Sequence, residues 1–146
     1  MKVLILFFLP FYLLASEVSV QVLGSGGPES GKRASASYLV KRDGKALILV
    51  DFGGGTFLRF AQSKAKIEEL EAILFTHLHI DHTVDLPALM KAGYFSQRTR
   101  SLPIVGPEKN DYFPGLKEYL KLQFGTQGAY RYMSDILGSQ SDSFSI

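Results

Sequence analysis

The chain places all three of its histidines in one six-residue segment, His77-Leu78-His79-Ile80-Asp81-His82, directly after the apolar run 72–75. Neutral imidazoles and a carboxylate are the ligands that zinc and neighbouring first-row transition metals prefer. The chain has no cysteine, so a metal has to be held by nitrogen and oxygen donors. The segment therefore predicts a metal site at the end of a buried strand.

The spacing inside this segment indicates how the ligands are shared. In an extended segment side chains alternate, so His77, His79 and Asp81 project to one side and His82 to the other. A turn at Asp81-His82 instead lets one segment serve two adjacent ions, with His77 and His79 on the first and Asp81 and His82 on the second. A surface cluster without function is the alternative, but it is disfavoured when every histidine of the chain lies in one segment around an aspartate.

The pattern His-x-His-x-Asp-His after a hydrophobic strand resembles the signature of the metallo-β-lactamase superfamily. Residues 49–55, Leu-Val-Asp-Phe-Gly-Gly-Gly, resemble an earlier motif of that family, in which an aspartate ends a strand just before glycines. Residues 22–28 and 33–39 resemble the opening strands of the ribonuclease Z-like branch, which includes phosphodiesterases and sulfatases. These matches follow the family order from about Val18 to about Ala92.

The resemblance implies an α/β fold, the αββα sandwich of this superfamily, and a hydrolase that uses water activated by two zinc ions. Manganese or iron are alternatives to zinc. The implied metal ligands are His77, His79, Asp81 and His82, and Asp81 is also the implied catalytic residue, which orients or deprotonates the water. Asp51 is implied to support the metal loop through hydrogen bonds without binding metal. The alternative for Asp51 is a plain turn former before three glycines.

The chain departs from the family after His82. Full members supply a further histidine, a bridging aspartate and a last histidine downstream, whereas this chain has no histidine after His82. The sandwich takes roughly 200 to 250 residues. We therefore expect residues 17–146 to be the N-terminal part of a longer domain whose C-terminal part is missing, with weak metal binding, little turnover, and an uncovered core that exposes Leu49, Ile73 and Phe75.

The first sixteen residues predict a secretory signal peptide, because Lys2 precedes the apolar run 3–14 and Ala15-Ser16 offers a cleavage site. An uncleaved N-terminal anchor is the alternative. Export to the periplasm or the exterior follows, with no stable membrane association after cleavage. Removing these residues leaves 15 basic against 14 acidic side chains, which gives no broad field for nucleic acid or anionic membrane. Two interpretations remain for Lys32-Arg33 and for Arg98 with Arg100: these residues form local anion contacts, or they are solvated surface charges.

The implied substrate is a small-molecule ester or phosphodiester, and export disfavours nucleic acid. The opening strands favour a phosphodiesterase over a lactonase, β-lactamase or sulfatase. A non-catalytic zinc-binding module is a further alternative, and so is a non-catalytic interaction protein on the same fold, which the intact ligand set disfavours. A homodimer is compatible with the sequence.

A competing motif occurs at residues 26–32, Gly-Gly-Pro-Glu-Ser-Gly-Lys, which begins like a phosphate-binding P-loop. Arg33 stands where a serine or threonine has to bind magnesium, and residues 34–40 predict a strand where a P-loop runs into a helix. We therefore reject a nucleotide-hydrolysing P-loop. A plain loop and a substrate-contacting loop both remain open for these glycines.

Periodicity and turn residues predict the remaining elements. Arg42-Asp43-Gly44 has the chemistry of a hairpin turn, and Asp85 is a candidate N-cap before Pro87. The polar segment 139–143 predicts a loop or disorder. Strands are predicted at 18–23, 35–41, 45–51, 70–75 and 102–105, and helices at 56–65, 85–92 and 114–124, with an additional turn at 67–70.

Overall fold

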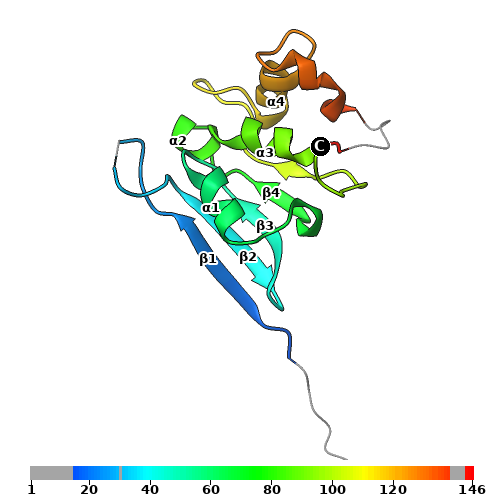
Figure 1. Cartoon of the computed structure of the whole chain (residues 1–146). Helices are drawn as coiled ribbons and strands as arrows, with labels where there is room; N and C mark the ends of the chain where they lie inside the picture. The colour runs from blue at the N-terminus through cyan, green and yellow to red at the C-terminus, as the bar shows by residue number, and fades with distance from the viewer. Residues whose placement is uncertain (1–14, 30, 139–143) are drawn as a thin grey trace, which may run out of the picture.

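Five strands form a mixed sheet in the order β1-β2-β3-β4-β5 in the computed structural model, which describes residues 15–29, 31–138 and 144–146. The first three strands are antiparallel, whereas β3, β4 and β5 run parallel (Figure 1). This mixed α/β topology agrees with the predicted fold class. The strands are β1 (Val18–Gly24), β2 (Ser37–Arg42), β3 (Lys45–Val50), β4 (Ala72–Leu74) and β5 (Ile104–Val105).

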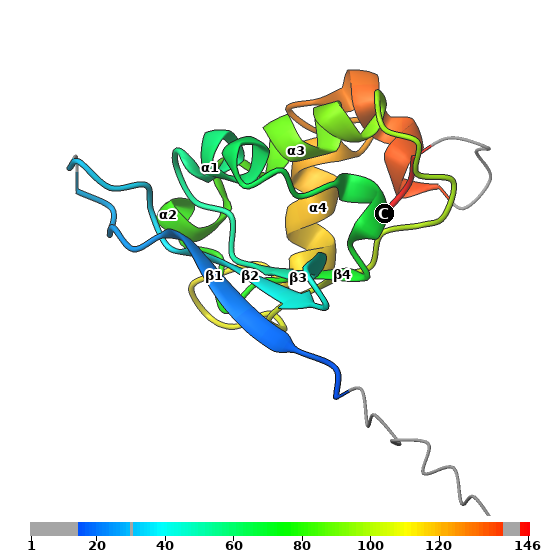
Figure 2. The ribbon, with the colours of Figure 1, turned by 60° about the horizontal axis from the view of Figure 1, so that its bottom comes forward.

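The parallel strands are joined by helical crossovers, as parallel pairing requires. Figure 2 shows the helices gathered on one face of the sheet. Between β3 and β4 the chain forms α1 (Thr56–Gln62) and the 3-10 helix η1 (Ile67–Glu69). Between β4 and β5 it forms α2 (Ile80–Thr83) and α3 (Leu86–Gly93), and after β5 it forms α4 (Leu116–Phe124) and the 3-10 helix η2 (Arg131–Leu137).

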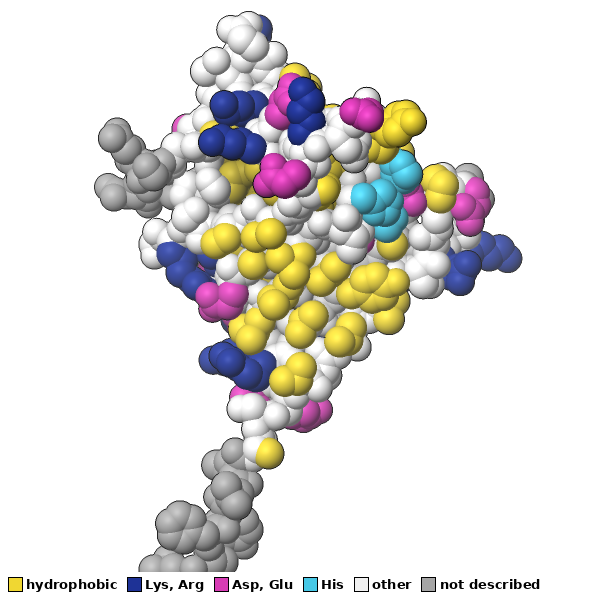
Figure 3. All heavy atoms as spheres, turned by 180° about the vertical axis from the view of Figure 1, so that it is seen from behind, with side chains coloured by type: hydrophobic (Ala, Val, Ile, Leu, Met, Phe, Trp, Pro, Cys, Tyr) yellow, Lys and Arg dark blue, Asp and Glu magenta, His cyan; other side chains and the backbone are white. Residues whose placement is uncertain are grey.

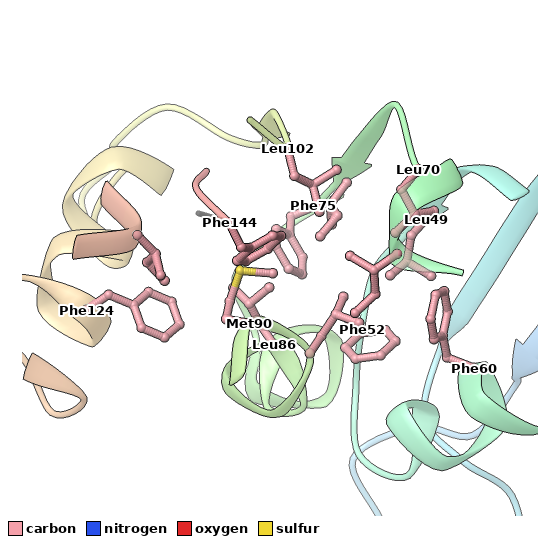
Figure 4. Packing of buried hydrophobic residues seen from close by; sticks show 14 of the residues in the cluster. Leu49, Phe52, Phe60, Leu70, Phe75, Leu86, Met90, Leu102, Phe124 and Phe144 are labelled. Carbon is pink, nitrogen blue, oxygen red and sulfur yellow. The ribbon is translucent and has the colours of Figure 1, made fainter. Parts of the chain in front are cut away.

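The hydrophobic core lies between the sheet and these helices. Leu49 and Ile73 have no exposed surface and Phe75 is 4% exposed, so the expectation that these residues are uncovered is wrong. The helices provide the cover. Phe52 packs edge-on against Phe60 of α1, with ring centroids 6.2 Å apart, and Figure 4 shows both rings beside Leu49 and Leu70.

The uncovered surface is the opposite face of the sheet. Val18, Val20 and Val22 alternate along β1 on this face and are 66%, 61% and 57% exposed. Register pairs Val22 with Tyr38 and Leu74 with Val105, and both Tyr38 and Val105 are also exposed. Figure 3 shows these apolar side chains gathered in yellow over this face. The sequence alone did not distinguish the two faces, because both faces of β3 are apolar.

Several predicted boundaries shift by a few residues. The helix predicted at 56–65 ends at Gln62, because Lys64 adopts a φ of 60°, which a continuing helix excludes. The strand predicted at 70–75 is shortened to Ala72–Leu74, and the one predicted at 102–105 to Ile104–Val105. The hairpin turn is present, with φ values of 52° at Asp43 and 78° at Gly44.

Asp85 stands at the N-cap position of α3, as predicted, but its side chain does not cap that helix. Its Oδ2 atom instead accepts the backbone N–H of Phe57, at 2.9 Å, in the first turn of α1. The carboxylate thus satisfies a free donor of a helix 28 residues earlier and ties α1 to the start of α3.

The predicted signal peptide falls almost wholly outside the described residues, and so does the predicted loop at 139–143. Among the residues described, no helix has the length and apolar character that a membrane span requires.

Candidate metal centre

The centre is built where two parallel strands end at the same edge of the sheet. β3 ends at Val50 and β4 at Leu74, and the N–H of Asp51 donates to the Leu74 carbonyl at 2.8 Å. Asp51 has a φ of 54°, a left-handed conformation that aspartate tolerates better than most residues. This conformation turns the chain off the strand.

Close backbone packing joins the Asp51 segment to the histidine segment. The N–H of Phe52 donates to the His82 carbonyl at 2.6 Å. A Cβ atom on Gly53 would lie 1.8 Å from the carbonyl oxygen of Asp81, so only glycine fits at this position. Gly53, two residues after Asp51, thereby lets α2, which carries Asp81 and His82, approach the end of β3.

The carboxylate of Asp51 is only 2% exposed and organises the segment after β4. Its Oδ1 accepts the N–H of Thr76 at 2.8 Å, and its Oδ2 accepts the Thr76 hydroxyl at 2.7 Å. The same Oδ2 lies 2.8 Å from His82 Nδ1. Because a carboxylate only accepts, Nδ1 has to carry a proton, and in the neutral ring this leaves Nε2 as an electron-pair donor.

The four predicted ligands form two pairs of donor atoms. His77 Nε2 lies 3.0 Å from His79 Nδ1, and His82 Nε2 lies 3.5 Å from Asp81 Oδ2. Two donors on one tetrahedral zinc lie about 3.3 Å apart, since each zinc–nitrogen bond is about 2.0–2.1 Å. Among the described residues, no three histidine or acidic side chains lie close enough together to hold one metal ion. The four side chains therefore provide two ligands for each of two ions.

The electrostatics favour the metal-binding form of His77. Burial is the main cause that lowers its pKa, followed by the neighbouring His82 and His79 rings. The ring centroids of His77 and His82 lie 4.0 Å apart, so the two pairs are adjacent. A neutral imidazole can bind a metal ion, whereas a protonated imidazole cannot.

The Metallo-beta-lactamase superfamily model matches residues 30–129, more than half of the chain. The chain belongs to the metallo-β-lactamase superfamily. It is 36% identical over 107 residues to ribonuclease Z of Metallosphaera sedula, a match that covers 73% of this chain and 34% of that protein. Ribonuclease Z of a Mycobacterium species is 37% identical over 120 residues, covering 78% of this chain and 40% of that protein.

A crystal structure of human tRNase Z, short form, superposes with a TM-score of 0.59 at 26% identity, covering 86% of this chain and 42% of that one. The chain thus spans less than half the length of these relatives. Members of the metallo-β-lactamase superfamily bind metal ions, typically zinc, and are hydrolases.

The structure adds site residues that sequence reasoning missed. Thr76 links Asp51 to His77, because its hydroxyl also lies 3.0 Å from His77 Nδ1. Phe113, from the loop before α4, packs against the His79 ring with centroids 5.1 Å apart. The position of Thr76 directly before the motif is a weak signal, and nothing in the sequence indicates Phe113.

The four basic residues weighed as anion contacts take different positions. Arg98 is 4% exposed, so neither an anion contact nor a solvated charge describes it. Its guanidinium donates to the carbonyls of Leu70 and Ser101 at 2.6 and 2.7 Å, and burial lowers its pKa. Arg100 pairs with Glu71 at 2.5 Å. Lys32 and Arg33 are exposed.

Proposed function

We propose that the whole protein is an exported, metal-dependent phosphodiesterase. The pairing of four donor side chains at one edge of the sheet, with Asp51 behind them, carries this proposal. Phosphodiester chemistry is favoured because the relatives reported above are ribonucleases Z and a tRNase Z. A small-molecule phosphodiester is the proposed substrate.

The proposed ligands are His77 and His79 for one ion and Asp81 and His82 for a second. We propose zinc, with manganese or iron as alternatives, because imidazole and carboxylate donors suit these ions. When bound, the metal supplies positive charge that polarises the scissile phosphate and acidifies water. Asp51 holds His82 in the tautomer that leaves Nε2 available.

Asp81 is the proposed catalytic residue. Its Oδ2 lies 3.5 Å from His82 Nε2 and its side chain is 12% exposed, so the carboxylate belongs to the donor cluster and retains a small solvent-accessible surface. A carboxylate there orients a water molecule and accepts its proton. Because a catalytic zinc usually holds three protein ligands and these residues supply two per ion, we expect the 146-residue chain alone to bind zinc weakly.

The experiment measures zinc binding first and hydrolysis second. The 146-residue chain is titrated with zinc against a chromophoric chelator, and His79→Ala should lower the zinc content. The same chain, extended by the downstream part of the Metallosphaera sedula ribonuclease Z, should hydrolyse bis(p-nitrophenyl) phosphate and lose this activity with EDTA.

Asp81→Asn should abolish turnover, and Asp111→Asn, an exposed aspartate on another loop, is the matched control. Turnover of p-nitrophenyl sulfate, a lactone or nitrocefin, but not of the phosphodiester, would reject the proposed substrate class. Zinc binding with no turnover of any of these would favour the non-catalytic module.

Export is proposed from the Lys2 and 3–14 pattern. In a bacterial host the chain should be trimmed near Ala15 or Ser16. Mass spectrometry that finds Met1 on the cytoplasmic protein would refute this.

A further inference from the structure

A concave surface lies near the candidate metal centre and is lined by none of its residues. It has a volume of about 350 Å³ and is formed by the end of β1, the segment before β2 and the C-terminal half of α1. The described residues that line it carry three cationic side chains and no acidic one. We name this surface the cationic pocket; the polar side chains that matter to it are Lys32, Arg33, Arg59, Gln21 and Gln62.

The local backbone brings these charges together. A Cβ on Gly24 would lie 1.8 Å from the Ser35 carbonyl oxygen, and the N–H of Gly26 donates to the Ala34 carbonyl at 2.8 Å. The segment that carries Lys32 and Arg33 is therefore held against the end of β1. From the other side, Arg59 of α1 donates from Nη1 to the Gln62 side-chain oxygen at 3.0 Å.

Among the residues that the structure describes, no carboxylate forms an ion pair with the three cations of the pocket. The ion pair that the described residues do form between an arginine and a carboxylate is Arg100–Glu71, which lies on another part of the surface. Glu29 lies on the same loop, but it is exposed and its carboxylate lies over Gly27. Like charges held near one another repel unless an anion lies between them.

We propose that the cationic pocket binds the terminal phosphate group of a small phosphorylated ligand. A terminal phosphate carries a charge of about −1.5 to −2, whereas a phosphodiester carries about −1, so three cations match the terminal group better. Guanidinium groups bind phosphate oxygens through paired hydrogen bonds. The Gln62 amide can donate a further bond while its oxygen holds Arg59.

The pocket and the metal centre are separated by one backbone segment. The N–H of Ser35 donates to the Gly54 carbonyl at 2.9 Å, and Gly53 packs against Asp81. Figures 1 and 2 both place the loop between β1 and β2 beside α2. The bound phosphate would thus belong to a substrate that also reaches the metal centre. This last step rests on the proposed function, whereas the binding itself does not.

The test measures pyrophosphate binding to the 146-residue chain by calorimetry in EDTA, so that no metal contributes. Arg33→Gln combined with Arg59→Gln should weaken binding about tenfold or more, because two charge-assisted contacts are lost. Arg42→Gln combined with Arg131→Gln removes the same charge from exposed positions elsewhere and should change the affinity less than about twofold. Lys32→Gln, on an exposed loop where folding is not at risk, should weaken binding about threefold.

If both double variants weakened pyrophosphate binding equally, the proposal that this pocket binds phosphate would be overturned. The absence of saturable pyrophosphate binding would overturn it as well. An eight-nucleotide oligothymidylate without terminal phosphates distinguishes the source of the phosphate. Tighter binding of this oligonucleotide, lost in the same variants, would overturn the terminal-phosphate assignment. Because the measurement involves no turnover, a failed hydrolysis assay leaves its outcome unaffected.

Discussion

Replacing Asp51 by asparagine tests how the metal loop is organised. The amide oxygen can still accept the N–H of Thr76, and the amide nitrogen can donate to the Thr76 hydroxyl. At His82, however, an amide N–H would face the Nδ1–H. The ring must then lose that contact or move its proton to Nε2, which removes Nε2 as a metal ligand.

The structure allows the size of the effect to be worked out. A hydrogen bond to a charged group contributes about 1.5–3 kcal/mol, so Asp51→Asn should lower the free energy of unfolding by about that amount. Asp51→Ala leaves both Thr76 donors and the His82 Nδ1–H unmatched and places alanine at a φ of 54°, so its cost should reach about 3–5 kcal/mol.

Urea unfolding of the chain, followed by circular dichroism at neutral pH, measures the free energy, and a competing chelator measures zinc affinity. Zinc affinity should fall about 10–100-fold with Asp51→Asn, the usual cost of losing a residue that orients a ligand. Asp111→Asn should lie within about 0.5 kcal/mol of the parent chain. If both Asp51 variants matched Asp111→Asn in stability and zinc affinity, the supporting role of Asp51 would be refuted.

Three further predictions concern the scaffold. Arg98→Lys should lower the free energy of unfolding in urea by about 2–4 kcal/mol, because one ammonium cannot reach the separate carbonyls that the buried guanidinium binds. An equal cost for Arg131→Lys, at an exposed position, would contradict this. Gly93→Ala should lower the free energy of unfolding by about 1–3 kcal/mol, because the added Cβ would lie 2.4 Å from the Phe144 ring. Gly138→Ala is the control, because its Cβ would lie 3.4 Å from the Asp135 carbonyl oxygen. Equal costs for the two variants would show that the Phe144 ring moves aside. Glu68 accepts the Gln97 N–H at 2.6 Å, which lowers its folded pKa below 4.5, so its contribution to stability is present above pH 4.5 and is lost as pH falls through the folded pKa. Glu68→Gln should therefore be less stable than the parent near neutral pH and equal to it in strong acid, and a constant difference across the titration would contradict this.

The sequence predicted the position of the donor cluster because the cluster is local. His77, His79, Asp81 and His82 lie within one segment, so a short turn such as α2 suffices to bring them near one another. Asp51 needed the family resemblance, because an aspartate before glycines is equally typical of an ordinary turn. Its contact with His82 spans 31 residues and depends on the parallel pairing of β3 with β4.

Features that depend on distant packing escaped prediction. Asp85 caps α1 because the fold brings its carboxylate next to Phe57, which lies 28 residues earlier in the chain. A local sequence pattern contains no information on that proximity. The buried state of Arg98 was missed for the same reason, since its acceptors are the carbonyls of Ile67, at the start of η1, and of Leu70, before β4. Which face of the sheet is covered also remained open, because valine, leucine and isoleucine occupy both faces of β3.

The contacts that organise the metal loop join segments at an intermediate separation in the chain. The contacts of Asp51 with Thr76 and His82, and of Asp85 with Phe57, span 25 to 31 positions. All of them fall within one unit, residues 51–85, which runs from the end of β3 to the start of α3. Closing a loop of that length costs only modest entropy, and each contact formed shortens the next closure. The unit can thus assemble as one cooperative folding step, and opening it would release the capped helix and the donor side chains together. Amide hydrogens of Asp51 and Thr76 would then exchange with solvent at a common rate, separate from those of the edge strand β1.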